Sequence, residues 1–348
     1  MDDPKHFPIP THNGGGANGD GNNAVRACLS RGALLHVEGD VDGARREYQA
    51  ALSLDPGNAT AWNNLGFTFA QEGRLDEAVR HYERALELDP DRSMALANLG
   101  AARFAQGDLQ AALEALARAV ESDPGNLLAW SNLGRLQLAA GEPAAAEAAW
   151  RGALELSPAD ADLYVSLGTA IAVQNRTEEA AAILRRAVEL DPASARGWAQ
   201  LGIVLFARHD LGSATDALRR ALALAPEDLD ARHHLATTLL ARGLTGEAVQ
   251  ELERMLVIDP ENAEAHTDLA VIALSQGRAT EALARLTALA EAGDDHPRAS
   301  FYRALALDQT GRGEEAVPQL QELASGEGKY AVRALQYLRA RAAEEPQA

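Results

Sequence analysis

Residues 59–92 read ATAWNNLGFTFAQEGRLDEAVRHYERALELDPDR, and the features of this stretch recur along most of the chain. Its proline, Pro90, belongs to a series in which neighbouring members are 34 residues apart. The series is Pro56, Pro90, Pro124, Pro158, Pro192, Pro226 and Pro260. A fixed period of this length is typical of repeat architectures. With the proline at position 32, repeats start at residues 25, 59, 93, 127, 161, 195 and 229, and two weaker ones start at 263 and 297.

Other positions of the repeat predict two helices and the turns between them. Position 20 is alanine in every repeat, and position 8 is glycine in the first six and alanine afterwards, so two helices can approach closely. Position 15 is usually glycine, which suits the left-handed residue after a helix; Asn175 and His209 replace it twice. Proline at position 32 ends the second helix. Position 34 then supplies an N-cap side chain, except at Arg92.

The pattern resembles the tetratricopeptide repeat, whose signature is W-x2-L-G-x2-Y, then A-x3-F, then P. Residues 59–92 match it nearly throughout, and position 4 is aromatic in three further repeats, at Trp130, Tyr164 and Trp198. The resemblance covers about 300 residues. It implies an all-α fold, in which two antiparallel helices per repeat stack into a right-handed α-α superhelix (a solenoid) with a concave groove.

The ends of the chain differ from the repeats. We expect residues 1–23, which are rich in glycine and asparagine, to form a disordered tail. The repeat array then covers residues 24–330. Residues 331–348 are expected to form a capping helix and a short tail, because the last repeat needs a polar cover for its apolar face.

Composition excludes several classes of function. The net charge of −19 opposes binding to nucleic acid or to an anionic membrane surface. One cysteine, Cys28, allows neither an intrachain disulfide nor a cysteine-based zinc site. The amino terminus lacks the pattern of a signal peptide, and no apolar stretch is long enough to span a membrane, so we expect a cytoplasmic protein.

The resemblance also indicates where a partner would bind, because positions 2, 5, 6, 9, 12 and 13 of such repeats face the groove. Position 6 is asparagine in three successive repeats, and its amide can donate to and accept from a peptide backbone. This resembles the asparagine ladder of O-linked N-acetylglucosamine transferases. Positions 9 and 12 are often apolar. The predicted peptide-binding residues are Asn64, Asn98, Asn132, Phe67, Phe104, Leu138 and Phe206. The alternative is that neighbouring repeats bury the apolar side chains and that the asparagines have no ligand.

We therefore predict a non-catalytic scaffold or adaptor that binds a protein or peptide, with a preference for basic partners because the chain is acidic. No phosphate-binding loop, hydrolase motif or metal-binding motif occurs, and the run GGGANGDG of the tail does not lie between a strand and a helix, so no catalytic residue, cofactor or metal ligand is expected. His233 and His234 point apart on a helix and cannot easily share a metal. Two alternatives stay open: a homo-oligomer, in which the segment KHFPIP of the tail fills the groove of another copy, and a regulatory partner of a separately encoded enzyme.

Overall fold

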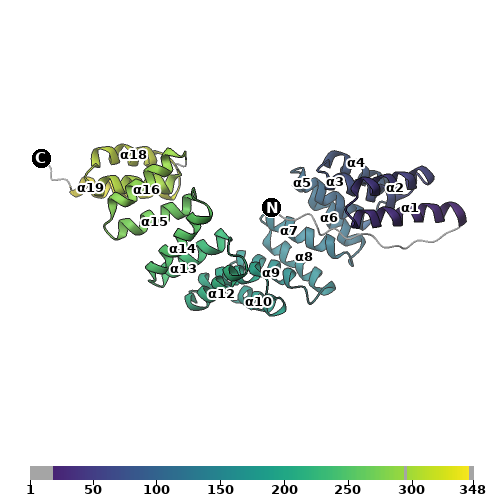
Figure 1. The fold of residues 1–348 in the computed structure, drawn as a ribbon, viewed down its shortest axis with the longest axis horizontal. Coiled ribbons are helices and arrows are strands. Elements are labelled where there is room, and N and C mark those ends of the chain that lie inside the picture. The colour runs from purple at the N-terminus through teal and green to yellow at the C-terminus, as the bar shows by residue number, and fades with distance from the viewer. Residues whose placement is uncertain (1–18, 294–295, 345–348) are drawn as a thin grey trace. The chain divides into compact units, whose positions relative to one another are not determined.

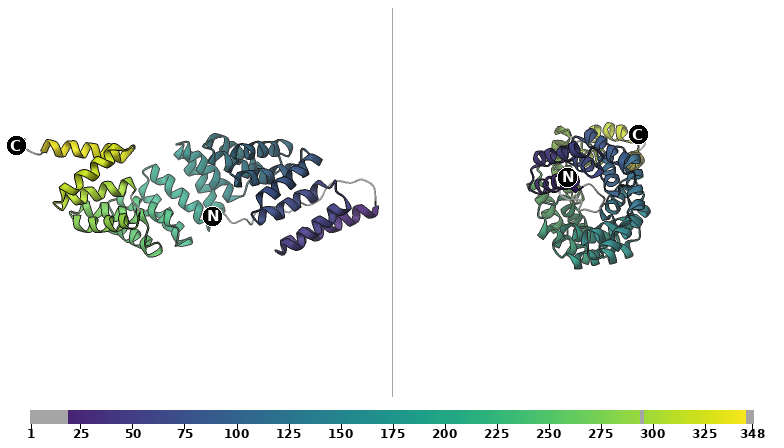
Figure 2. Two further views of the ribbon diagram at one scale, coloured as in Figure 1. Left: turned by 90° about the horizontal axis from the view of Figure 1, so that it is seen from above. Right: turned by 90° about the vertical axis from the view of Figure 1, so that its right-hand side faces the viewer.

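A computed structural model describes residues 19–293 and 296–344, and all regular elements among them are helices. The chain divides into two compact units, Met1–Pro192 and Ala193–Ala348. Within each unit every helix packs against the next one along the chain. The helices form successive antiparallel hairpins, which can be followed in Figure 1 and, from two further directions, in Figure 2. The predicted all-α class is confirmed.

Each repeat contributes one hairpin, and a single helix follows the last one. The first helices of the hairpins are α1 (Gly19–Val37), α3 (Ala59–Gln71), α5 (Ser93–Ala105), α7 (Leu127–Ala139), α9 (Ala161–Val173), α11 (Ala195–Ala207), α13 (Leu229–Ala241), α15 (Ala263–Ser275) and α17 (Pro297–Gln309). The second helices are α2 (Val41–Leu54), α4 (Leu75–Leu88), α6 (Leu109–Ser122), α8 (Pro143–Leu156), α10 (Thr177–Leu190), α12 (Leu211–Leu224), α14 (Thr245–Ile258), α16 (Ala279–Glu291) and α18 (Gly313–Ser325). The final helix is α19 (Lys329–Glu344).

The two helices of a hairpin approach each other at positions 8 and 24 of the repeat. A Cβ atom added to Gly100 would lie 2.7 Å from Leu116, and one added to Gly134 would lie 2.8 Å from the ring of Trp150. The large side chain at position 24 therefore fills the space that a glycine at position 8 leaves open. Burying such a leucine stabilises the fold by about 1.5–3 kcal/mol. The same Cβ on Gly100 would lie 3.1 Å from the carbonyl oxygen of Ala112 at position 20, so the small residues at positions 8 and 20 mark the close approach of the two helices.

The turns follow the rules that the sequence indicated. Seven glycines at position 15, four in the first unit and three in the second, adopt left-handed backbone angles, with φ between 74° and 85°. Asn175 and His209 adopt the same conformation, with φ of 63° and 60°. The side chain at position 34 caps the following helix in six repeats, for example Asn58 Oδ1, which accepts from the N–H of Ala61 at 3.0 Å. Arg92 makes no such bond.

The helix boundaries can be compared with the expected repeats. From residue 59 onward, every first helix begins where a repeat was expected to start. The helix α1 begins at Gly19, inside the segment 1–23 that was expected to be a tail, while residues 1–18 lie outside the described residues. The final helix packs on α18 and α17, where the side chain of Tyr337 donates to Asp308 at 2.6 Å and Arg341 forms an ion pair with the same carboxylate.

None of the helices in the described part of the chain combines the length and the apolar character that a bilayer crossing requires.

Candidate protein-binding surface

The three asparagines at position 6 lie on equivalent turns of α3, α5 and α7, and all three are largely buried. Asn64 is 7% exposed, Asn98 6% and Asn132 9%. Each side chain therefore presents only a small part of its amide to solvent, and its first partners belong to the protein itself.

An asparagine that the sequence analysis did not single out connects two of them. Asn98 donates from Nδ2 to Oδ1 of Asn63 at 3.0 Å, and Asn63 donates from Nδ2 to Oδ1 of Asn64 at 3.2 Å. Asn63 is 1% exposed, so this chain of amides crosses from one repeat to the next inside the protein. Burial raises the pKa of the Tyr48 hydroxyl to about 12, although a hydrogen bond with Asn64 acts in the opposite direction. Farther along, Arg135 donates to Oδ1 of Asn132 at 3.2 Å.

The apolar side chains predicted for the groove are neither fully exposed nor fully buried. Phe67 lies against the ring of His36, with 4.8 Å between the ring centroids. Phe104 packs against a buried cluster that includes Leu116 and Leu133. Leu138 and Phe206 are also partly buried. These four side chains keep part of their apolar surface available, on the first helices of four repeats.

In the second unit, charged side chains gather at positions 2, 5 and 6 of the repeat. His233 Nε2 lies 2.8 Å from Oδ2 of Asp268, and His233 Nδ1 lies 3.4 Å from a carboxylate oxygen of Glu264. Arg298 forms an ion pair with the other oxygen of Asp268. We call His233, Glu264, Asp268 and Arg298 the charged cluster. It joins three successive repeats through α13, α15 and α17.

The charged cluster stabilises its own ionised forms. The hydrogen bond with Asp268 raises the pKa of His233, although burial and the charge of Arg298 act in the opposite direction. Burial would raise the pKa of Asp268, but the hydrogen bonds and positive charges of His233 and Arg298 outweigh it and hold that pKa below its usual value. An imidazole with a carboxylate at each nitrogen donates two hydrogen bonds only when it is protonated. The raised pKa of His233 and the lowered pKa of Asp268 therefore have the same cause, the attraction between the protonated ring and the carboxylate. For His234, burial and the neighbouring His233 lower the pKa.

Neither histidine belongs to a metal-ligating group. The rings of His233 and His234 tilt apart, with their centroids 6.3 Å from each other. Among residues 19–293 and 296–344, no group of three or more histidine, cysteine, aspartate or glutamate side chains has the arrangement of a metal site. Cys28, a core residue, is buried among Val25, Ala51 and Ala61.

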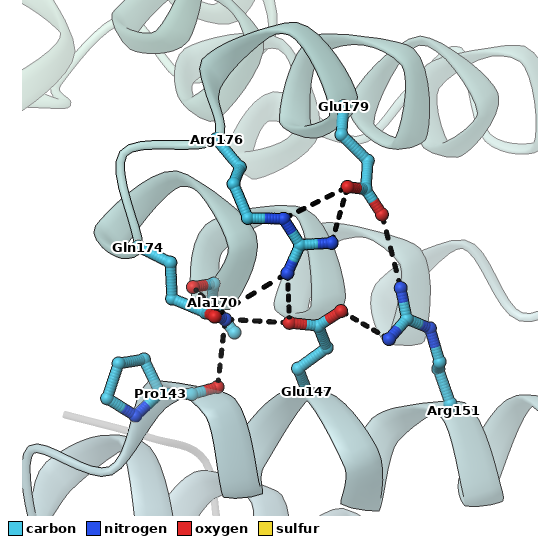
Figure 3. A network of polar contacts seen from close by, with 7 residues as sticks. All are labelled: Pro143, Glu147, Arg151, Ala170, Gln174, Arg176 and Glu179. Carbon is cyan, nitrogen blue, oxygen red and sulfur yellow. Dashed lines mark hydrogen bonds and ion pairs between the residues drawn. The ribbon is translucent and has the colours of Figure 1, made fainter.

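A second polar network joins α8 to α9 and α10, as Figure 3 shows. Its centre is Glu147, which is 4% exposed. Gln174 Nε2 and Arg176 Nη1 each donate to Glu147 Oε2 at 2.7 Å, and Arg151 forms an ion pair with the other oxygen. Both arginines also bind Glu179.

The role of this network is structural. Burial would raise the pKa of Glu147, but the hydrogen bonds from Gln174 and Arg176 and the charges of Arg151 and Arg176 outweigh it and lower the pKa. A carboxylate held in its ionised form by two guanidinium groups is a poor proton donor at neutral pH. The network therefore links two neighbouring repeats and does not resemble a catalytic acid.

Hairpins of this geometry, with their glycine, alanine and proline columns, define a tetratricopeptide-repeat protein. The profile of the family described as cilia and flagella-associated protein 70 C-terminal domain, a domain of tetratricopeptide repeats, matches residues 10–237. The chain therefore belongs to this family. The profile of the cytochrome c-type biogenesis protein H TPR domain matches residues 178–299. A comparison with curated proteins gave no significant match.

Several solved structures share the fold. PilF of Pseudomonas aeruginosa has a TM-score of 0.56 at 20% identity and aligns 62% of this chain with 99% of its own. The C-terminal part of a TPR repeat-containing protein from Cytophaga hutchinsonii has a TM-score of 0.54 at 16% identity, covering 69% of this chain and 97% of that one. A chain of the APC/C hetero-tetramer Cut9–Hcn1 has a TM-score of 0.56 at 17% identity, covering 83% of this chain and 57% of that one.

Proposed function

We propose that this protein is a non-catalytic scaffold or adaptor that binds a protein or peptide segment along the first helices of its repeats. The observation that carries the proposal is the recurrence of partly exposed apolar side chains on those helices. Apolar surface that recurs at equivalent positions is typical of partner-binding surfaces. The proposed contact residues are Asn64, Asn98, Asn132, Phe67, Phe104, Leu138 and Phe206.

These residues would contribute to binding in different ways. Phe67, Phe104 and Leu138 would supply apolar area, because part of each ring or side chain is still open to solvent. The asparagines would contribute through the small part of each amide that is exposed, and through the hydrogen bonds that hold neighbouring first helices together. The net charge of −19 favours a segment that carries basic residues, since complementary charge speeds the encounter.

The proposal is tested by substituting the apolar residues while leaving the fold intact. Peptides selected from a random displayed library would be titrated against the wild type and against Phe67→Ser/Phe104→Ser/Leu138→Ser, with binding followed by fluorescence anisotropy. We expect the triple variant to bind at least about tenfold more weakly, which corresponds to a loss of about 1.4 kcal/mol over three contact residues together. A second variant, Asn64→Ala/Asn98→Ala/Asn132→Ala, tests the amides.

The matched control substitutes apolar residues on the second helices. Leu54, Leu88 and Leu156 are 55%, 37% and 42% exposed, and all three lie at position 30 of their repeats. Leu54→Ser/Leu88→Ser/Leu156→Ser should bind like the wild type. Equal loss in both triple variants, or no loss in the Phe67 variant, would contradict the proposal. Circular dichroism would verify that each variant keeps its helices.

A further inference from the structure

Repeat position 4 forms a recurring contact, and one repeat replaces its aromatic ring with a charge. The indole N–H of Trp62 donates to the carbonyl oxygen of Pro56 at 2.9 Å, and that of Trp130 donates to Pro124 at the same distance. In the repeat that starts at residue 229, Arg232 stands at position 4 and its guanidinium donates to the carbonyl of Pro226. The arginine therefore keeps the hydrogen bond of the tryptophans and lacks their ring.

The position-4 side chain also contacts positions 23 and 26 on the second helix of its own repeat. The ring of Trp62 stacks on His81 at position 23, and the guanidinium of Arg220, at position 26, lies 4.7 Å from the ring centroid of Trp198. Arg232 instead forms an ion pair with Glu251 at position 23, with 2.6 Å between Nη1 and Oε2. Glu251 also pairs with Arg254 at position 26.

A pocket of about 370 Å³ opens beside Arg232, between α12, α13 and α14. We call it the arginine pocket. Its lining residues are Arg219, Leu222, Ala223, Arg232, Leu235, Glu251 and Arg254. A second pocket, of about 350 Å³, lies two repeats later between α16, α17 and α18, in a repeat whose position 4 is Ser300. Arg232, at position 4, lines the arginine pocket, whereas Ser300 is not among the residues that line the second pocket.

The two pockets differ in charge. Three arginines and one glutamate line the arginine pocket, a net charge of +2 in a chain whose net charge is −19. Arg303, Arg312, Glu291 and Glu315 line the other pocket and cancel. The second pocket is therefore a neutral comparison site of similar volume within the same protein.

Arg232 is the anchor of the arginine pocket. It is 7% exposed, and its Nε atom is buried without a hydrogen-bond partner. A buried guanidinium donor without an acceptor costs free energy that an oxyanion could recover. Arg219 and Arg254 are mostly exposed, at 52% and 61% of their side chains, and Arg219 pairs with Glu247 at 2.6 Å. The exposed pair of Arg219 with Glu247 is weak, so Arg219 can turn toward a stronger acceptor, whereas Arg254 also pairs with the largely buried Glu251.

We propose that the arginine pocket binds a phosphate group, either inorganic phosphate or a phosphate monoester such as a phosphorylated side chain. Planar guanidinium groups match phosphate oxygens with paired, charge-assisted hydrogen bonds. Two negative charges on the ligand suit the net charge of the lining, and Leu222 and Leu235 provide a partly apolar wall that strengthens the attraction. The pocket uses none of the residues proposed for peptide binding, so this inference stands or fails separately from that function.

Isothermal titration calorimetry at constant ionic strength would measure binding of inorganic phosphate and of O-phosphoserine, with serine as the comparison that lacks the phosphate. The wild type should bind phosphate saturably at one site per chain. Arg219→Gln/Arg254→Gln, which removes only the exposed guanidinium groups, should weaken binding by about tenfold or more. Arg303→Gln/Arg312→Gln, in the neutral pocket, should leave it unchanged.

A filled pocket gives the decisive comparison. Arg232→Trp/Glu251→Ala copies the arrangement of Trp198, Ala217 and Arg220 in the preceding repeat, and it keeps an N–H donor for Pro226. This variant should fold, as circular dichroism would verify, and should not bind phosphate. Tighter binding of O-phosphoserine than of phosphate would identify a monoester as the ligand, and the reverse order would identify free phosphate. No saturable binding of either compound, or equal binding by the filled variant, would overturn the proposal.

Discussion

The same contact between neighbouring repeats is built from amides in the first unit and from charges in the second. Asn63 and Asn98 are related by 35 residues, from position 5 of one repeat to position 6 of the next, and His233 and Asp268 have the same relation. The first pair is a hydrogen bond of 3.0 Å between uncharged side chains. The second is a contact of 2.8 Å between a histidine and a carboxylate that Arg298 also holds. The comparison shows that the repeat specifies where side chains meet and leaves open what chemistry they use.

The packing between the helices of a hairpin should behave alike in both units, in contrast to the contacts between repeats. Leu116 and Leu252 occupy position 24 in the first and the second unit, and both are fully buried. Leu116→Ala and Leu252→Ala should each lower the free energy of unfolding by about 2–5 kcal/mol, because each leaves a cavity in a close-packed core. Urea unfolding followed by circular dichroism measures both. A large difference between the two variants would show that the shared columns do not contribute equally to the two units.

The columns that determine this packing are the ones that the sequence made visible. Glycine at position 8 and the large residue at position 24 recur because each contact is local to one hairpin, and left-handed Asn175 and His209 could be foreseen for the same reason. The pairing of Asn63 with Asn98, and that of His233 with Asp268, could not be read from any recurring residue. The two pairings share only their spacing in the sequence, one repeat plus one residue, and the side chains at these positions change from repeat to repeat.

The burial of the predicted asparagines was also beyond the sequence pattern. Whether position 6 presents its amide to a ligand depends on how closely the neighbouring first helices pack, and Asn63 brings Asn64 and Asn98 together inside the protein. The pocket beside Arg232 depends in the same way on whether the surrounding helices close the space that a missing ring leaves. The sequence identifies residues that depart from the repeat pattern, whereas the packing of the neighbouring helices determines whether such a residue is buried or lines a pocket.

Charge should make the contact in the second unit more costly to remove than the contact in the first. Asp268→Asn keeps the size of the side chain but leaves Arg298 without its carboxylate, and we expect a loss of about 3 kcal/mol. Asn98→Ala removes a neutral hydrogen bond and should cost about 1 kcal/mol. Thermal unfolding of the two variants beside the wild type measures the difference. If Asn98→Ala proved as destabilising as Asp268→Asn, the charges would add nothing to the contact.

The smallest expected effect concerns pH, and it separates the two contacts because only one of them titrates near neutrality. The raised pKa of His233 means that its protonated form is favoured in the folded protein. The stabilising contribution of His233 is therefore fully present below the ordinary histidine pKa of about 6.5 and is lost as the pH rises through the raised value.

The variant His233→Asn keeps a donor for Asp268 without the charge, so it should be less stable than the wild type by about 1 kcal/mol at mildly acidic pH. His234 is present in both proteins, and burial, the larger cause of its lowered pKa, acts in both; the smaller cause, the charge of His233, is absent from the variant, which narrows the gap at acidic pH. Melting temperatures measured from mildly acidic to alkaline pH should converge as the pH rises, whereas Asn63→Ala should stay below the wild type by a constant amount. A gap for His233→Asn that is independent of pH, or that widens toward alkaline pH, would mean that the imidazole acts in this cluster as a neutral hydrogen-bonding group.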